Sequence, residues 1–147
     1  MEKNDFKKYE FVDITKADTA FVAFGRGLNE VFSNSGLALC ATIADIDNVE
    51  QKEERNIEVE GYDLKSLMFS WLSDILFFSS SEYLLFSKFE VEIEKEGEDY
   101  KLKGKCFGEK FDENKHEINT EVKAITYHMM EIKEENGIWK SQVIVDI

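Results

Sequence analysis

Residues 63–78 read DLKSLMFSWLSDILFF, and this stretch decides the fold class. Its apolar side chains recur at steps of three and four residues, the spacing of an amphipathic helix. Asp63 can cap the first turn, and we expect the helix to end at Ser79, Ser80 and Ser81. The apolar stripe is wide, so we place this helix at the centre of the molecule. Residues 28–43 show the same spacing and predict a second helix.

The segment that follows the serines predicts a charged β-hairpin. Apolar residues alternate with glutamates before residue 97 and with lysines after residue 98. Folding the hairpin at this point sets Ile93 against Leu102 on one face. The other face then carries three opposite-charge pairs, Glu94 with Lys101, Glu92 with Lys103 and Glu90 with Lys105.

A second hairpin is predicted at Asn136-Gly137, which is the strongest short signal for such a turn. It pairs residues 122–132 with residues 138–147, and a two-residue loop sets Tyr127 opposite Asp146. The same register sets His128 opposite Val145. Shorter strands are expected at Tyr9–Val12, Phe21–Gly25 and Arg55–Gly61.

These elements predict one α+β domain over residues 1–147. We expect a mixed, mostly antiparallel sheet of about six or seven strands, with two helices packed on one face. No repeat, proline or low-complexity linker divides the chain.

Composition limits the classes of function. The 147 residues carry 18 basic and 31 acidic side chains, a formal net charge of −13. This sign disfavours independent nucleic-acid binding and docking on an anionic membrane. The longest apolar stretch falls short of the ~20 residues that a bilayer requires, and the N-terminus lacks a secretory signal. We therefore expect a cytoplasmic protein.

The motifs of common enzymes are absent or incomplete. Residues 25–27 form a lone GxG without the third glycine of a dinucleotide site, and residues 104–110 do not match a P-loop. Cys40 and Cys106 lie among apolar residues and are expected to be reduced, buried thiols. A nucleophilic pair of either cysteine with His128 is therefore disfavoured.

Carboxylates near the two chain ends form the candidate site. Asp13 and Asp18 flank the loop after the first strand, Asp146 is penultimate and Ile147 carries the terminal carboxylate. If that loop lies over the same sheet end, Asp18, Asp146 and the terminus converge. Clustered anionic oxygens require a cation or raised pKa values, and Lys123 can supply part of the compensation. Alternatively, Asp13 and Asp18 are turn residues and Asp146 is a frayed end.

Several ordered motifs resemble the archease family, and together they span nearly the whole chain. The most specific is VKAITYH at residues 122–128, which is similar to the family's Lys-Ala-(Ile/Val)-Thr-Tyr-His strand. The ending VIVDI at residues 143–147 resembles the family's Asp-plus-aliphatic C-terminus. Shorter runs match at residues 52–55 and 84–87, at Gly108-Glu109 and at His116-Glu117.

The N-terminal motif departs from the family pattern Asp/Glu-His-Thr-Ala-Asp-(Ile/Val)-Gly. Residues 13–20 read DITKADTA, so Ile14 replaces the histidine, Lys16 is inserted and Ala20 replaces the glycine. We match residues 17 and 18 to the family's Ala-Asp. Asp18 is then the metal-site aspartate, and Asp13 is the second candidate for that position.

The resemblance implies a function that composition does not show. Archeases are partner proteins of the GTP-dependent tRNA-splicing RNA ligase. They promote guanylylation of the ligase's active-site histidine, allow multiple turnovers and broaden nucleotide use, without being known as enzymes. The implied cofactor is a divalent cation, Ca²⁺, held by Asp18, Asp146 and Ile147.

The residues expected to act on the ligase are Lys123, His128 and Asp13. Two other functions remain open from the sequence. One is an acidic chaperone or interaction module that uses Ca²⁺ structurally, and the other is a small hydrolase built on the carboxylates.

Overall fold

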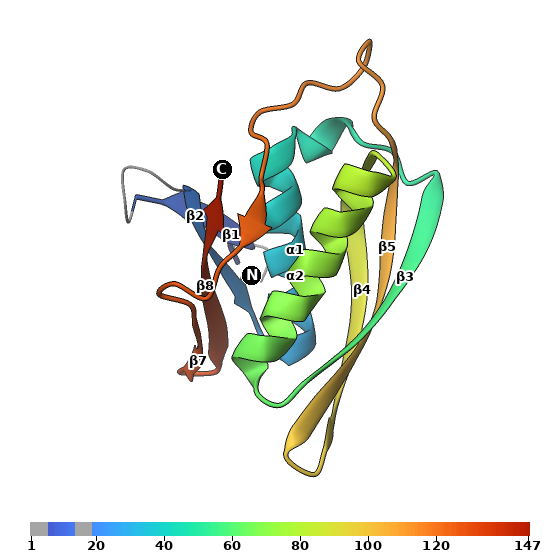
Figure 1. Cartoon of the computed structure of the whole chain (residues 1–147). Coiled ribbons are helices and arrows are strands. Elements are labelled where there is room, and N and C mark those ends of the chain that lie inside the picture. The colour runs from blue at the N-terminus through green and yellow to red at the C-terminus, as the bar shows by residue number, and fades with distance from the viewer. Residues whose placement is uncertain (1–5, 14–18) are drawn as a thin grey trace.

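The computed structural model describes residues 6–13 and 19–147. Within them two α-helices and eight strands confirm the α+β class (Figure 1). The elements in chain order are β1 (Tyr9–Val12), β2 (Thr19–Gly25), α1 (Leu28–Ile43), the 3-10 helix η2 (Ile46–Asn48), β3 (Glu53–Gly61), α2 (Leu64–Ser81), β4 (Leu84–Glu96), β5 (Asp99–Lys110), β6 (Ala124–Ile125), β7 (Glu131–Glu135) and β8 (Ile138–Asp146).

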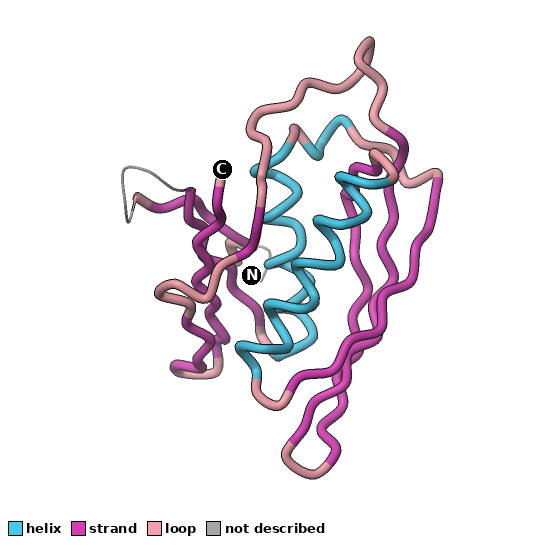
Figure 2. The backbone as a smooth tube through the Cα atoms, in the orientation of Figure 1, coloured by secondary structure: helices cyan, strands magenta, loops and turns pink. Residues whose placement is uncertain are grey.

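The strands form two antiparallel sheets instead of the single mixed sheet expected. One has the order β1-β2-β8-β6, with β7 also paired to β8, and the other has the order β3-β5-β4. Figures 1 and 2 show α1 and α2 lying between these sheets. The reason is visible on α1, where the Ser35 hydroxyl meets that of Ser141 in β8 and the next residue, Gly36, packs on Phe89 in β4. Because α1 is buried on two sides, each side packs against a different sheet.

The helix α2 begins and ends where the sequence predicts, at Asp63 and within the three serines. The Asp63 carboxylate accepts the Ser66 amide at 2.8 Å, and the Ser66 hydroxyl oxygen accepts the Asp63 amide at 3.2 Å, which completes a capping box. The three serines form the last residues of the helix, which ends at Ser81. The Ser80 hydroxyl donates to the Leu76 carbonyl one turn back, so it is satisfied without a break.

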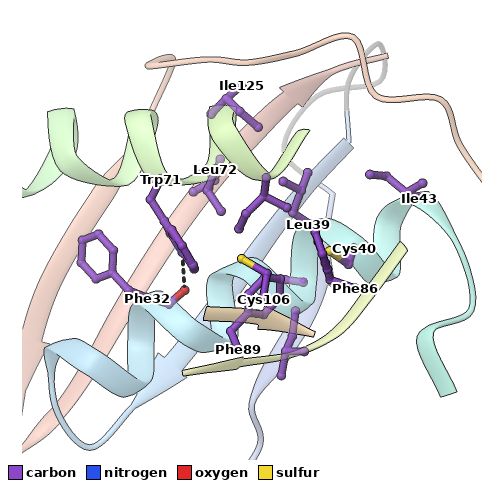
Figure 3. Close-up of a cluster of buried hydrophobic side chains, with 14 of the residues drawn as sticks. Phe32, Leu39, Cys40, Ile43, Trp71, Leu72, Phe86, Phe89, Cys106 and Ile125 are labelled. Atoms are coloured by element: carbon purple, nitrogen blue, oxygen red, sulfur yellow. Dashed lines mark hydrogen bonds between the residues drawn. The ribbon is translucent and has the colours of Figure 1, made fainter. Parts of the chain in front are cut away.

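The core lies around Trp71, which is fully buried (Figure 3). Its indole N–H donates to the Phe32 carbonyl at 2.9 Å, which ties α2 to α1. Cys40 and Cys106 lie buried in the same core, as predicted. Burial raises the pKa of both thiols, that of Cys40 to about 12, so neither is a nucleophile.

The β4–β5 hairpin has the predicted register. Glu94 lies opposite Lys101 and Ile93 opposite Leu102, and Gly97 turns the chain with a φ of +64°. Strand β3 pairs with the outer edge of β5, and this extends the charged face. Among the described residues, no helix is both long and apolar enough to cross a membrane.

Candidate functional site at the end of the five-stranded sheet

Strand β6 fixes Lys123 beside the C-terminus. Ala124 pairs with Asp146 and Ile125 with Val145, and the Lys123 amide donates to the Asp146 carbonyl at 2.7 Å. The Lys123 side chain is exposed, as are Asp146 and Ile147. Main-chain hydrogen bonds therefore bring three of the expected site residues together while leaving their charged groups in solvent.

Strands β1 and β2 reach the same sheet end. Thr19 pairs with Val145, and Val12 pairs with Ala20, which itself pairs with Ile144. Asp13 directly follows β1 and is exposed. Asp18, the other predicted carboxylate, lies outside the described residues.

The predicted place of His128 is wrong. Residues 131–135 pair with β8 in the expected register, including Lys133 opposite Lys140. Between β6 and β7, however, seven positions separate Ala124 from Glu131, while their partners on β8 are four apart. The extra residues between β6 and β7 form a turn. In this turn the Met130 amide donates to the Tyr127 carbonyl at 3.1 Å, and Met129 has a φ of 53°.

His128 therefore sits exposed in this turn and not opposite Val145. The segment before the turn stays on the sheet because the Thr126 hydroxyl donates to the Ile144 carbonyl at 2.8 Å. Asp146 is thus opposite Ala124 and not opposite Tyr127.

A buried ionic cluster, which the sequence did not predict, lies on the connection from β5 to β6. The Glu109 carboxylate accepts the Glu50 amide at 2.9 Å and the Lys115 ammonium at 2.8 Å. It also lies 2.9 Å from Nε2 of buried His116. Because His116 Nδ1 accepts the Asp112 amide at 3.0 Å, Nε2 carries the proton and donates to Glu109.

These contacts determine the ionisation of Glu109. Desolvation alone would raise the pKa of this carboxyl group, but the hydrogen bonds from Glu50, Lys115 and His116 outweigh it and lower the pKa to about 2. The cluster fixes the start of residues 111–123, and the Asn119 amide fixes their middle by donating to the Ile43 carbonyl at 2.8 Å. The family resemblance includes Glu109 and His116, but it does not predict that they contact each other.

The candidate cation ligands fit a hard cation by their chemistry. Asp146 and the terminal carboxylate of Ile147 are exposed anionic oxygen donors, the type that Ca²⁺ prefers. Within the described residues, no three His, Cys, Asp or Glu side chains are grouped so as to hold a metal ion. The predicted set is a different one, because it joins a main-chain terminus to Asp146 and to Asp18.

The chain is a small α+β domain in which two sheets enclose two helices. Lys123 lies beside the C-terminus at one end of the five-stranded sheet. Comparison with known families places the chain among known domains of this kind. Residues 9–147 match the model of the Archease protein family (MTH1598/TM1083). The chain belongs to the archease family.

Similar proteins cover nearly the whole chain. The archease of Methanothermobacter thermautotrophicus is 44% identical over 141 residues, which span 96% of this chain and 99% of that protein. The archease of Sulfurisphaera tokodaii is 43% identical with the same coverage.

Solved structures agree with the fold. The solution structure of Methanobacterium thermoautotrophicum protein 1598 is 44% identical and superposes with a TM-score of 0.85, covering 97% of this chain and 100% of that one. A crystal structure from Thermotoga maritima, described as an archease and possible chaperone, is 19% identical. Its TM-score is 0.56, with 90% and 93% of the two chains covered, so it supports the fold alone.

Proposed function

We propose that this chain is a non-catalytic activator of the tRNA-splicing RNA ligase, promoting guanylylation and repeated turnover in tRNA splicing. One observation carries the proposal beyond family membership. The two most family-like segments, residues 122–128 and 143–147, meet through the hydrogen bond between the Lys123 amide and the Asp146 carbonyl. A shared, solvent-facing site at the junction of both segments is what a partner surface requires.

The sheet end is proposed to bind a divalent cation, Ca²⁺, through Asp18, Asp146 and the terminal carboxylate of Ile147. Asp18 precedes Thr19 in sequence, and Thr19 pairs with Val145, the neighbour of Asp146. When bound, the cation would supply positive charge near the nucleotide phosphates of the ligase. Lys123 would add a second positive charge from the same sheet end.

His128 and Asp13 have lesser proposed roles. His128 is displaced from the sheet by the turn after β6, so it is available as a contact to the ligase and not as a metal ligand. Asp13 is exposed at the end of β1, where its carboxylate adds to the negative field around the cation.

The net charge of −13 supports a basic partner. An enzyme that binds RNA carries a positive surface, and opposite charges accelerate its encounter with an acidic protein at low salt. We place both proteins in the cytoplasm, where the buried cysteines stay reduced.

The second candidate function is an acidic, calcium-binding chaperone without a role in RNA ligation. The Thermotoga maritima archease is described as a possible chaperone, and a role of that kind would also suit an acidic surface. Guanylylation of the purified ligase with GTP, followed with and without this chain, separates the two. An increased rate supports the activator, and an unchanged rate across a range of doses overturns it.

A further inference from the structure

A second surface feature lies beside the β6–β7 connection. The β3–α2 turn, the first turns of α2 and this connection surround an open hollow of about 510 Å³. Aromatic side chains of Tyr62, Phe69 and Tyr127 line it. The rings of Phe69 and Tyr127 are stacked, with centroids 4.4 Å apart and an angle of 5° between their planes.

The aromatic rings in this hollow remain open to solvent. Tyr62 is 73% exposed and Tyr127 is 50% exposed, although both are large enough to favour burial. Stacking on Phe69, which packs against the core, holds the ring of Tyr127 at a fixed position. Rigid exposed aromatic rings provide contact area for a partner at little cost in side-chain entropy.

The charge of the hollow identifies the kind of ligand it suits. Two carboxylates, those of Glu60 and Asp99, line it, and no described lysine or arginine does. Lys101 faces Glu60 across the strands, but its ammonium group lies 3.5 Å from Glu96. The carboxylates therefore lack a counterion within the described residues, which disfavours a phosphate or nucleic-acid ligand and favours a cation.

We propose that this hollow receives an arginine side chain of a partner protein. A guanidinium group is planar, so it can stack on an exposed tyrosine ring and still donate two hydrogen bonds to a carboxylate. Lysine offers neither the flat face nor the paired donors. Taking the RNA ligase as that partner rests on the proposed function, whereas the preference for arginine rests on the hollow itself.

The location of the hollow fits a contact that accompanies the sheet end. Tyr127 lies two residues after β6, and Lys123 lies directly before β6. Residues 123–127 therefore contribute both to the hollow and to the sheet end that carries Asp146. An arginine held at Tyr127 would restrain the orientation of the partner over Lys123 and Asp146.

The direct test is a titration with the capped tripeptide acetyl-Gly-Arg-Gly-amide, followed by NMR of the aromatic side chains. We expect saturable shifts of the Tyr62 and Tyr127 signals, and no saturation with the citrulline peptide, which is flat and neutral. The double variant Glu60→Gln, Asp99→Asn should weaken arginine binding roughly fivefold to tenfold. Tyr83→Ala, which removes a 67% exposed aromatic ring near the other end of α2, is the control and should change nothing. Equal binding of the two peptides, or an unchanged affinity in the double variant, would overturn the proposal.

A second measurement separates this proposal from the proposed function. Calorimetric titration of the ligase should give a roughly tenfold weaker affinity for Tyr127→Ala than for the unaltered chain, and Tyr127→Phe should retain most of it. If the ligase binds the unaltered chain and Tyr127→Ala equally, the hollow is not its contact and the arginine proposal fails for this partner alone. If the ligase does not bind, the proposed function fails, and the peptide titration alone decides on the hollow.

Discussion

Lys123 is held at the sheet end by its backbone, and its side chain is free for a partner. Within the described part of the chain its ammonium group has no ion-pair partner, while its amide bonds to the Asp146 carbonyl. Lys123→Ala should change the free energy of unfolding by less than ~0.5 kcal/mol, as an ordinary surface substitution does. The rate of ligase guanylylation should fall severely, because the positive charge at the sheet end is lost.

Denaturant unfolding and guanylylation kinetics of the same preparations measure both effects. Lys105→Ala removes an exposed lysine from β5, outside the site, and serves as the matched control. Full activation by Lys123→Ala would remove this residue from the functional surface.

The proposed Ca²⁺ site includes the C-terminal carboxylate, which a small covalent change can remove. A short neutral extension after Ile147 turns that carboxylate into an amide carbonyl and removes one negative charge from the proposed site. Because the number of anionic oxygens sets the affinity for Ca²⁺, we expect binding to weaken by about tenfold or more. Asp146→Asn and Asp18→Asn should act in the same direction, and Asp13→Asn should act less.

Calorimetric Ca²⁺ titration of these variants provides the measurement. The β8 pairings end at Asp146, so the extension leaves the fold intact and circular dichroism should not change. Equal affinity in the extended and unaltered chains would show that the terminus is not a ligand. A larger loss from Asp13→Asn than from Asp18→Asn would show that the family motif is aligned wrongly around Lys16.

At the scale of elements, β5 and α2 approach each other closely at one glycine. A Cβ atom added at Gly104 would lie 2.5 Å from the Trp71 ring. That ring is fully buried and is fixed by its hydrogen bond to the Phe32 carbonyl, so it cannot move aside. Gly104→Ala should lower the free energy of unfolding by ~1–3 kcal/mol.

Urea unfolding measures this cost. Gly27→Ser is a suitable control because a Cβ atom there meets nothing within 4 Å and serine suits the N-cap position of α1. The control should stay within about 0.5 kcal/mol of the unaltered chain. If Gly104→Ala is equally neutral, the helix and sheet are not packed as tightly as described.

The connection between β5 and β6 depends on the charge of Glu109. Its pKa in the folded chain is about 2, below the ordinary value of 4.5, so its contribution to stability is present above pH 4.5 and is lost as the pH falls toward 2. Glu109→Gln cannot ionise. The difference in free energy of unfolding between the unaltered chain and this variant should therefore be largest near pH 6 and shrink as the pH falls to 3.

Urea unfolding across this pH range tests the prediction. Glu113→Gln, on the same connection but outside these hydrogen bonds, controls for a change of surface charge. A difference that stays constant between pH 6 and pH 3 would show that the Glu109 carboxylate is not stabilised by Lys115 and His116.

Local patterns in the sequence predicted the helices and most of the strands. The features that were predicted wrongly depend on contacts between residues distant in sequence. The register of Glu94 with Lys101 follows from strict alternation around one turn, and the N-cap at Asp63 follows from its place directly before the apolar stripe of α2. The turn after β6 was missed because its positive φ falls on Met129, a residue type that gives no turn signal. The split into two sheets, and the contact of Glu109 with His116, depend on how separate elements pack.

The same limit applies to the candidate site. The pattern predicted that Lys123 and Asp146 belong to neighbouring strands, and β6 confirms it. The predicted hairpin at Asn136-Gly137 had no interruption, and for this reason it placed His128 beside Val145. The aromatic hollow carries no sequence signature, since Tyr62, Phe69 and Tyr127 come from three separate segments.

At the scale of the whole molecule, the two sheets enclose the helices, and the C-terminus lies at one end of the five-stranded sheet (Figure 1). The buried helices give the domain its stability, so the sheet end can carry exposed charge without a structural role. This separation allows an acidic domain with buried, inert thiols to act through its surface alone. The arrangement agrees with the proposed function, in which the chemistry would belong to the partner.

The most direct measurement of the central claim is the number of ligated RNA products formed per ligase molecule. The ligase is supplied with GTP and RNA in excess, and this chain is added in amounts well below those of the ligase. The account predicts that ligation, stalled near one product per ligase without this chain, continues through repeated turnovers, and that the chain alone ligates no RNA and hydrolyses no nucleotide. A product yield that is the same with and without the chain, at every dose, would contradict the account.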